Sequence, residues 1–153
     1  MMRKHRGFRA SGWAAGAVVL GVALAGCSAP AVQVSDLERA ATADDVLPAT
    51  VTSDMTEMVD VETVRFVGER AGFRVYLGES TDDGYCILLT GPGDTDGRVG
   101  CGGGGGGAVY NELQVEQDAF RSAADGASPG EDWEAISENV YYREVPVETP
   151  ADD

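Results

Sequence analysis

Basic side chains other than arginine are almost missing from this 153-residue sequence, and the two that occur lie at its start. They are Lys4 and His5. Four of the 11 Lys and Arg residues precede residue 27 and no acid does, so residues 27–153 hold 7 basic against 26 acidic residues, a net charge of −19. This excess of negative charge excludes a nucleic-acid-binding protein, which needs cations to face phosphates.

The same absence removes most catalytic arrangements from residues 27–153. Ser-His-Asp and Cys-His sites lack their base, and Ser-Lys, Schiff-base and P-loop sites lack their lysine. A pair of carboxylates that cleaves a glycosidic bond remains as a hypothesis, but 26 acids offer so many pairs that none stands out. We therefore predict that the chain is not an enzyme and name no catalytic residue.

The first 26 residues have the layout of a secretory signal. Residues 1–10 carry four positive charges, and Ser11–Leu24 is an uncharged, largely apolar run of 14 residues. A permanent membrane span is the weaker interpretation, because a helix needs about 20 residues to cross the hydrocarbon core. No Arg-Arg pair is present, which favours the general secretory (Sec) route over the twin-arginine route.

The end of this segment, Leu24-Ala25-Gly26-Cys27, matches the bacterial lipobox, and residues 1–26 resemble a lipoprotein signal peptide. The resemblance implies that the Cys27 thiol receives a diacylglyceryl group and that the chain is cut before it. The new amino terminus is then a further acylation site, for palmitate for example. Two or more acyl chains hold a protein stably at a bilayer, since each buried CH₂ contributes about 0.8 kcal/mol. The alternative is an ordinary cleaved signal that leaves Cys27 as a free thiol.

The other two cysteines, Cys86 and Cys101, form an even pair on the oxidising side of a membrane. The segment Gly91–Gly97 between them is rich in turn residues, so the two are expected to face each other across a hairpin and to form a disulfide. Two buried free thiols are the alternative. We predict no metal site, because two cysteines without a histidine supply half of a tetrahedral zinc shell.

Strand patterns dominate the remainder of the chain. Thr63–Gly68 and Phe73–Leu77 alternate with period two around Glu69–Gly72 and predict a hairpin, with Phe73, Val75 and Leu77 on one face. The unbroken apolar run Tyr85–Thr90 predicts a central strand that is covered on both faces.

Further elements are expected on either side of these strands. Ser35 is placed to cap a brief helix over Asp36–Ala41, with Glu38 completing a capping box. Residues 108–115 and 139–145 are predicted strands, and 118–124 is predicted to form one or two helical turns. The fold class is therefore α+β and mainly antiparallel β, a small single-sheet or partly open barrel-like domain with a short N-terminal helix and one disulfide.

We divide the chain into a signal peptide (1–26), a lipidated tether (27–34), one β-rich extracytoplasmic domain (35–145) and a disordered acidic tail (146–153).

Several loose motifs accompany the lipobox, namely Asp45–Pro48, Val64–Gly68, Gly84–Leu89 and Gly100–Gly103. Together they resemble the small lipoproteins of high-GC Gram-positive (actinobacterial) bacteria. The resemblance implies attachment to the cell envelope and supplies no catalytic residue.

Three other patterns have both a structural and a functional interpretation. Asp82–Gly84 and Asp94–Gly97 are typical of tight turns, and the alternative is that their carboxylates bind Ca²⁺. The run Gly102–Gly107 lacks the βαβ setting of a dinucleotide site and indicates a flexible loop. A set of aromatic residues is expected in the core, with a ligand groove as the alternative: Tyr110, Phe120, Trp133, Tyr141 and Tyr142.

These observations predict a non-enzymatic interaction or accessory module of the cell envelope, lipid-anchored on the outer face of the cytoplasmic membrane. Its expected partners are the membrane, through the lipid, and another envelope protein, with no nucleic acid and no cofactor other than the lipid on Cys27. A small-ligand or cation-binding envelope protein is the alternative, and a carboxylate-dependent hydrolase is a third hypothesis.

Overall fold

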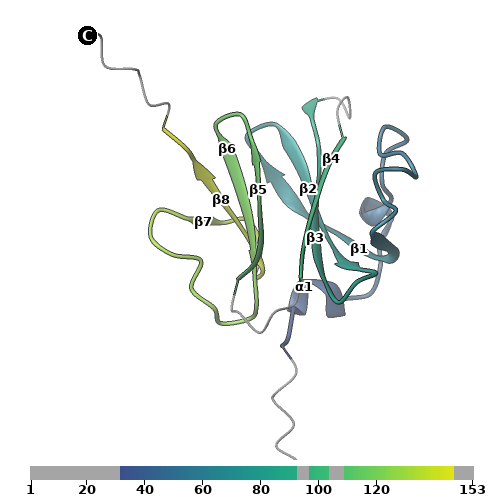
Figure 1. Cartoon of the computed structure of the whole chain (residues 1–153), viewed down its shortest axis with the longest axis horizontal. Coiled ribbons are helices and arrows are strands. Elements are labelled where there is room, and N and C mark those ends of the chain that lie inside the picture. Colours follow the sequence, from purple (N-terminus) through teal and green to yellow (C-terminus); the bar gives the residue numbers. More distant parts are fainter. Residues whose placement is uncertain (1–31, 93–96, 104–108, 147–153) are drawn as a thin grey trace, which may run out of the picture. The chain divides into compact units, whose positions relative to one another are not determined.

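Strand-forming sequence dominates the residues that the computed structural model describes, 32–92, 97–103 and 109–146 (Figure 1). The chain divides into two units, Met1–Pro30 and Ala31–Asp153, and every described residue belongs to the second. Its elements are α1 (Ser35–Glu38), the 3-10 helix η1 (Ala43–Asp45), β1 (Val59–Arg70), β2 (Phe73–Ser80), β3 (Gly84–Thr90), β4 (Gly97–Gly103), β5 (Val109–Val115), β6 (Asp118–Ala123), β7 (Glu134–Ala135) and β8 (Val140–Glu144).

The first sheet has the order β1-β2-β3-β4, with all neighbours antiparallel. The predicted hairpin is confirmed, because β1 and β2 pair across a turn that sets Arg70 opposite Phe73. Ala71 and Gly72 in this turn have φ values of 52° and 82°, the left-handed conformation that tight turns use. The predicted central strand is also confirmed, since β3 lies between β2 and β4 and is buried along almost its whole length.

The second sheet has the order β5-β6-β8-β7. The strands expected at 108–115 and 139–145 are confirmed as β5 and β8. The helical turns expected at 118–124 are wrong, because Asp118–Ala123 is strand β6 and pairs with β5 on one side and β8 on the other. Backbone pairing on both edges outweighs the weak local preference of this stretch for a helix. The two-residue strand β7 has no signal in the sequence.

Apolar side chains from both sheets meet in a shared core. Val75, Leu77, Ile87 and Leu89 of the first sheet pack in one cluster with Phe120 and Val140 of the second. The predicted shared face of Phe73, Val75 and Leu77 is confirmed by this cluster. A second cluster covers the opposite face of the first sheet and contains Val59, Val64, Tyr76, Cys86 and Leu88.

The expected mainly antiparallel fold is confirmed, with its strands divided between two sheets instead of a single one. Each sheet turns an apolar face toward the other, and packing these two faces together removes both from water. Asn111 of β5 joins the sheets, because its Nδ2 donates to the Gly100 carbonyl at 2.7 Å and to the Tyr85 carbonyl at 3.1 Å. Ser122 on β6 donates to Asn111 Oδ1 at 2.9 Å.

The N-terminal helix is shorter than expected and is capped differently. It ends at Glu38, its N-cap residue is Val34, and no side chain caps it. The capping box lies instead at the next turn, between Thr42 and Asp45. Val34, which we placed at the end of the tether, is 5% exposed and belongs to the core, so the packed domain begins before Ser35.

Candidate functional site

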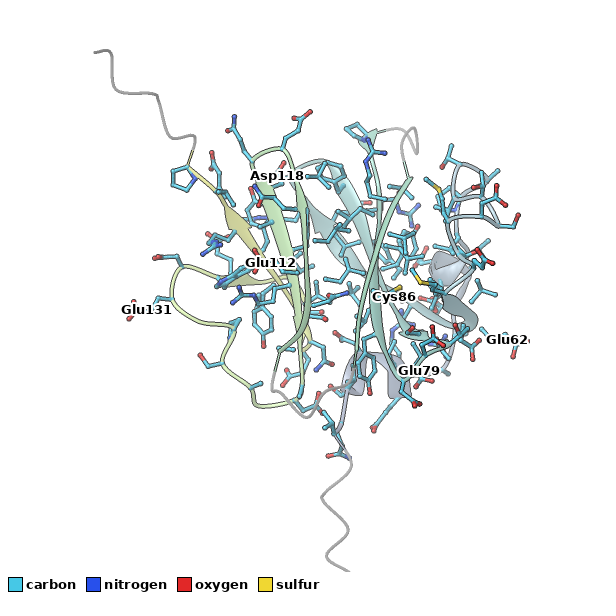
Figure 2. The ribbon with its side chains drawn as sticks, in the orientation of Figure 1. Glu62, Glu79, Cys86, Glu112, Asp118 and Glu131 are labelled. Atoms are coloured by element: carbon cyan, nitrogen blue, oxygen red, sulfur yellow. A yellow bond between two sulfur atoms is a disulfide. The ribbon has the colours of Figure 1, made fainter. Side chains whose placement is uncertain are left out.

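The structure describes two of the three cysteines that the sequence analysis singled out. Cys86 and Cys101 are directly opposite each other on β3 and β4 and form the predicted disulfide, with their Cα atoms 4.0 Å apart. Figure 2 labels Cys86 on the first sheet. The lipidation residue Cys27 lies outside the described residues and stays a prediction, as does the acidic tail beyond Pro146.

A polar cluster attaches the N-terminal segment to the second sheet. The side chain of Asn139 is fully buried, and its Oδ1 accepts a hydrogen bond from the Asp36 N–H at 3.0 Å. Asp125 accepts from the Ser35 N–H at 2.9 Å and from Asn139 Nδ2 at 2.7 Å. These bonds, led by the one from the Ser35 N–H, hold the pKa of Asp125 below its ordinary value. The cluster fixes the position of the start of α1 against the second sheet.

A hollow of about 550 Å³ lies beside β8, where the short strand β7 leaves the edge of β8 uncovered. Its lining includes Arg70, Glu134 and Tyr142. Arg70 pairs with Glu134, and its guanidinium carbon lies 4.8 Å from the centre of the Tyr142 ring. The Tyr142 hydroxyl donates to Asp118 at 2.7 Å, and this hydrogen bond is the main cause that raises the pKa of Tyr142 to about 12. The hollow thus offers paired charges and one aromatic ring.

The outer face of the second sheet carries an arrangement that the sequence analysis did not foresee. The guanidinium carbons of Arg121 and Arg143 lie 4.1 and 4.6 Å from the centre of the Trp133 ring. Arg121 also pairs with Glu112 on the neighbouring strand β5. Trp133 is 12 positions from Arg121 and 10 from Arg143. The pairing of β8 with β6 on one side and with β7 on the other brings the three side chains together.

The aromatic residues that were expected in the core lie in different surroundings. Phe120 is fully buried in the core, and Tyr142 packs against that core and lines the hollow. Tyr141 is half-buried and donates from its hydroxyl to the Glu138 carbonyl at 3.0 Å. The Tyr110 side chain lies outside the described part of the structure.

Of the two acidic turns, one is described. Asp82 and Asp83 lie in the turn between β2 and β3, Gly84 is the first residue of β3, and Asp83 has a φ of 57°. Asp94 to Asp96, and Gly104 to Gly107 of the glycine run, lie outside the described residues, while Gly102 and Gly103 end β4. Within 32–92, 97–103 and 109–146, no group of three His, Cys, Asp or Glu residues is placed to hold a metal ion.

Comparison of the chain with protein-family models, with curated proteins and with solved structures finds no significant match. Among the described residues, no helix has the length and hydropathy needed to span a bilayer.

Proposed function

We propose that this protein is a lipid-anchored interaction module on the outer face of the cytoplasmic membrane, without enzymatic activity of its own. The observation that carries the proposal is the Cys86–Cys101 disulfide. Disulfides persist mainly in oxidising compartments outside the cytoplasm, which is where a lipobox signal would deliver the chain. The sequence of residues 1–27 and the disulfide are independent features that point to the same location.

The start of the packed domain supports a short anchor. Val34 is in the core and lies seven positions after Cys27 in the sequence, with six residues between the two. A chain of this length spans at most about 25 Å when fully extended. A partner would then meet the domain close to the membrane surface, which suits an accessory role beside another envelope protein.

The absence of lysine and histidine after residue 26 supports a binding role over a catalytic one. The arginines described around Trp133 and Tyr142 are held in ion pairs or against aromatic rings. Such groups stabilise a scaffold and contribute to recognition, but arginine is a poor proton donor or acceptor near neutral pH.

The first experiment concerns the anchor. Cys27→Ala should accumulate as an unprocessed precursor, whereas the wild-type chain should be recovered from membranes with a mass that begins at Cys27 and includes lipid. The double variant Cys86→Ala, Cys101→Ala is the matched control, because it removes two cysteines and leaves the lipobox intact. An intact 153-residue wild-type chain in the cytosol would overturn the proposal.

The hollow beside β8 favours a second candidate, a small-ligand or cation-binding envelope protein. Tyr142 and the Arg70–Glu134 pair line it, and Asp132 and Glu144 add carboxylates at its rim. Isothermal calorimetry and thermal melting with Ca²⁺ test the cation form of this idea. A melting temperature unchanged by millimolar Ca²⁺ would count against it.

A further inference from the structure

A second hollow, of about 290 Å³, lies where the segment before β1 meets β1 itself. Most of its lining is aliphatic and comes from Ala41, Val46, Leu47, Val61 and Val64. Val46 is 72% exposed and Val61 is 53% exposed. Four large hydrophobic side chains are exposed among the described residues, and both of these belong to that set. We call this region the Val46–Val61 surface.

Acidic side chains outnumber basic ones around the Val46–Val61 surface. Residues 40–64 contain six acids and no Arg, Lys or His. Arg65 also lines the hollow, and its guanidinium donates to the backbone carbonyls of Arg39, Glu62 and Val64. Asp44 lies two positions before Val46, and Asp60 directly precedes Val61. Glu62 lines the hollow. All three are exposed, and none forms an ion pair with a described residue. Figure 2 shows Glu62 pointing away from the domain at its margin.

The backbone beside this surface is closed to an added strand. β1 is an edge strand, but its register with β2 is interrupted between Asp60 and Arg65. The N–H of Phe66 donates to Asp45, and the Phe66 carbonyl accepts from Arg39. A partner that adds a β-strand needs a continuous row of free backbone groups. The surface therefore suits a partner that binds through side chains.

We infer that the Val46–Val61 surface binds an amphipathic helical segment of a partner protein, with aliphatic side chains in the hollow and Lys or Arg residues opposite Asp44, Asp60 and Glu62. This inference rests on the proposed interaction function and names the surface and the chemistry of the partner. An amphipathic helix in a hydrophobic groove is an established mode of recognition. Charges at the rim of such a groove select the partner and speed its association.

The experiment places a photo-crosslinking side chain at position 61 in the full, lipid-anchored chain in its own membranes. The matched control carries it at Gln114, which is also exposed to solvent but lies on β5 in the other sheet. The partner protein is expected to be crosslinked from position 61 and not from position 114. Mass spectrometry of the crosslinked peptide should find aliphatic residues flanked by Lys or Arg.

A variant without the three carboxylates tests whether the partner's Lys or Arg residues contribute to binding. The triple variant Asp44→Asn, Asp60→Asn, Glu62→Gln should reduce the crosslinking yield by about tenfold, which corresponds to about 1.4 kcal/mol spread over three rim charges. Its thermal unfolding should match that of the wild type, because all three side chains are exposed. The control Glu131→Gln, also exposed and on the β6–β7 loop, should leave the yield unchanged.

Each of the following results would overturn the inference. The first is crosslinking of position 61 to an acidic segment, a lipid or a second copy of this chain. The second is a crosslinking yield that is unchanged in the triple charge variant, and the third is crosslinking of a partner from position 114 without crosslinking from position 61. The last result leaves the proposed interaction function standing and rejects only this surface. Lack of capture from both positions in a lipid-anchored chain also rejects this surface, and lack of capture together with an unlipidated chain rejects the proposed function as well.

Discussion

Asp45 accepts a hydrogen bond from the backbone N–H of Phe66 at 2.7 Å, although 21 positions separate the two residues in the chain. Arg39 donates to the Phe66 carbonyl at 2.8 Å and lies 2.5 Å from the Asp45 carboxylate. Two side chains thus take the place that a neighbouring strand would occupy. Because unpaired edge strands promote aggregation, this arrangement protects the edge of the first sheet.

Replacing Asp45 by Asn should destabilise the fold by about 1–3 kcal/mol at pH 7, since it weakens charge-assisted hydrogen bonds at a buried position. Burial alone would raise the pKa of Asp45, but the hydrogen bonds from Arg39 and from the N–H groups of Thr42 and Phe66 outweigh it and hold that pKa well below its usual range. Chemical denaturation of Asp45→Asn and of the wild type measures the difference.

The lowered pKa also predicts how the Asp45 effect depends on pH. The unfolded chain takes up the proton first, at about pH 4, so the stabilisation is complete above that pH and is lost as the pH falls toward the folded-state pKa. The difference in free energy of unfolding between Asp45→Asn and the wild type should therefore narrow as the pH falls from about 5 to about 2. Asp44→Asn, one residue away and exposed, is the control and should show no comparable gap.

Replacing Asn139 by Ala should destabilise the domain by about 2 kcal/mol or more, because it leaves buried polar groups without partners. The amide of Asn139 donates to the Ala123 carbonyl at 2.9 Å and accepts from the Asp36 N–H at 3.0 Å. Hydrogen exchange should accelerate first at Ser35–Glu38, where the N-terminal segment is attached. Gln114→Ala at an exposed site should leave exchange there unchanged, and equal protection in both variants would contradict the prediction.

Removing the disulfide with Cys86→Ala and Cys101→Ala should lower the free energy of unfolding by about 3 kcal/mol, because the bond closes a loop with a sequence separation of 15. Equilibrium denaturation measures this loss, and a reductant added to the unfolding wild-type chain should reproduce it. Cys27→Ala is the control and should leave the free energy of unfolding unchanged. A double variant as stable as the wild type would show that the constraint contributes little.

Replacing Arg121 by Met should cost about 1 kcal/mol, since it removes one of the two guanidinium groups that lie over Trp133 and the ion pair with Glu112. The Trp133 environment should become more hydrated, with its fluorescence emission shifted to longer wavelength. The control is Arg98→Met, because Arg98 is exposed, lies on β4 of the other sheet and donates to the carbonyl of its neighbour Gly97. An identical emission change in both variants would reject the specific role of Arg121.

Much of the first sheet was predictable from residues close together in the chain. The alternation in β1 and β2 and the apolar run of β3 each encode a burial pattern in consecutive positions. The partner of Cys86 followed from a count of cysteines and a turn-rich segment. The second sheet was harder, because β6 is short and owes its conformation to pairing with two other strands, and β7 has only two residues.

The polar contacts were beyond the reach of sequence patterns. No local pattern separates the roles of the 26 acids. Asp45 accepts from the Phe66 N–H at the edge of the first sheet, and Asp118 accepts from the Tyr142 hydroxyl. Asp125 accepts from the Ser35 N–H and so attaches the N-terminal segment. Each of these roles depends on partners that are distant in sequence, so no local pattern distinguishes the three from other acids.

The sequence by itself determined the charge of the chain, its lack of lysine and histidine after residue 26, its lipobox motif and its preference for strands, because composition and period are properties of the unfolded chain as well. Only the tertiary structure decided that the strands form two sheets, that Val34 enters the core while Val46 and Val61 stay in water, and which carboxylates acquire partners. The physical reason is that burial and hydrogen bonding depend on which surfaces meet, and that is settled when distant segments pack together.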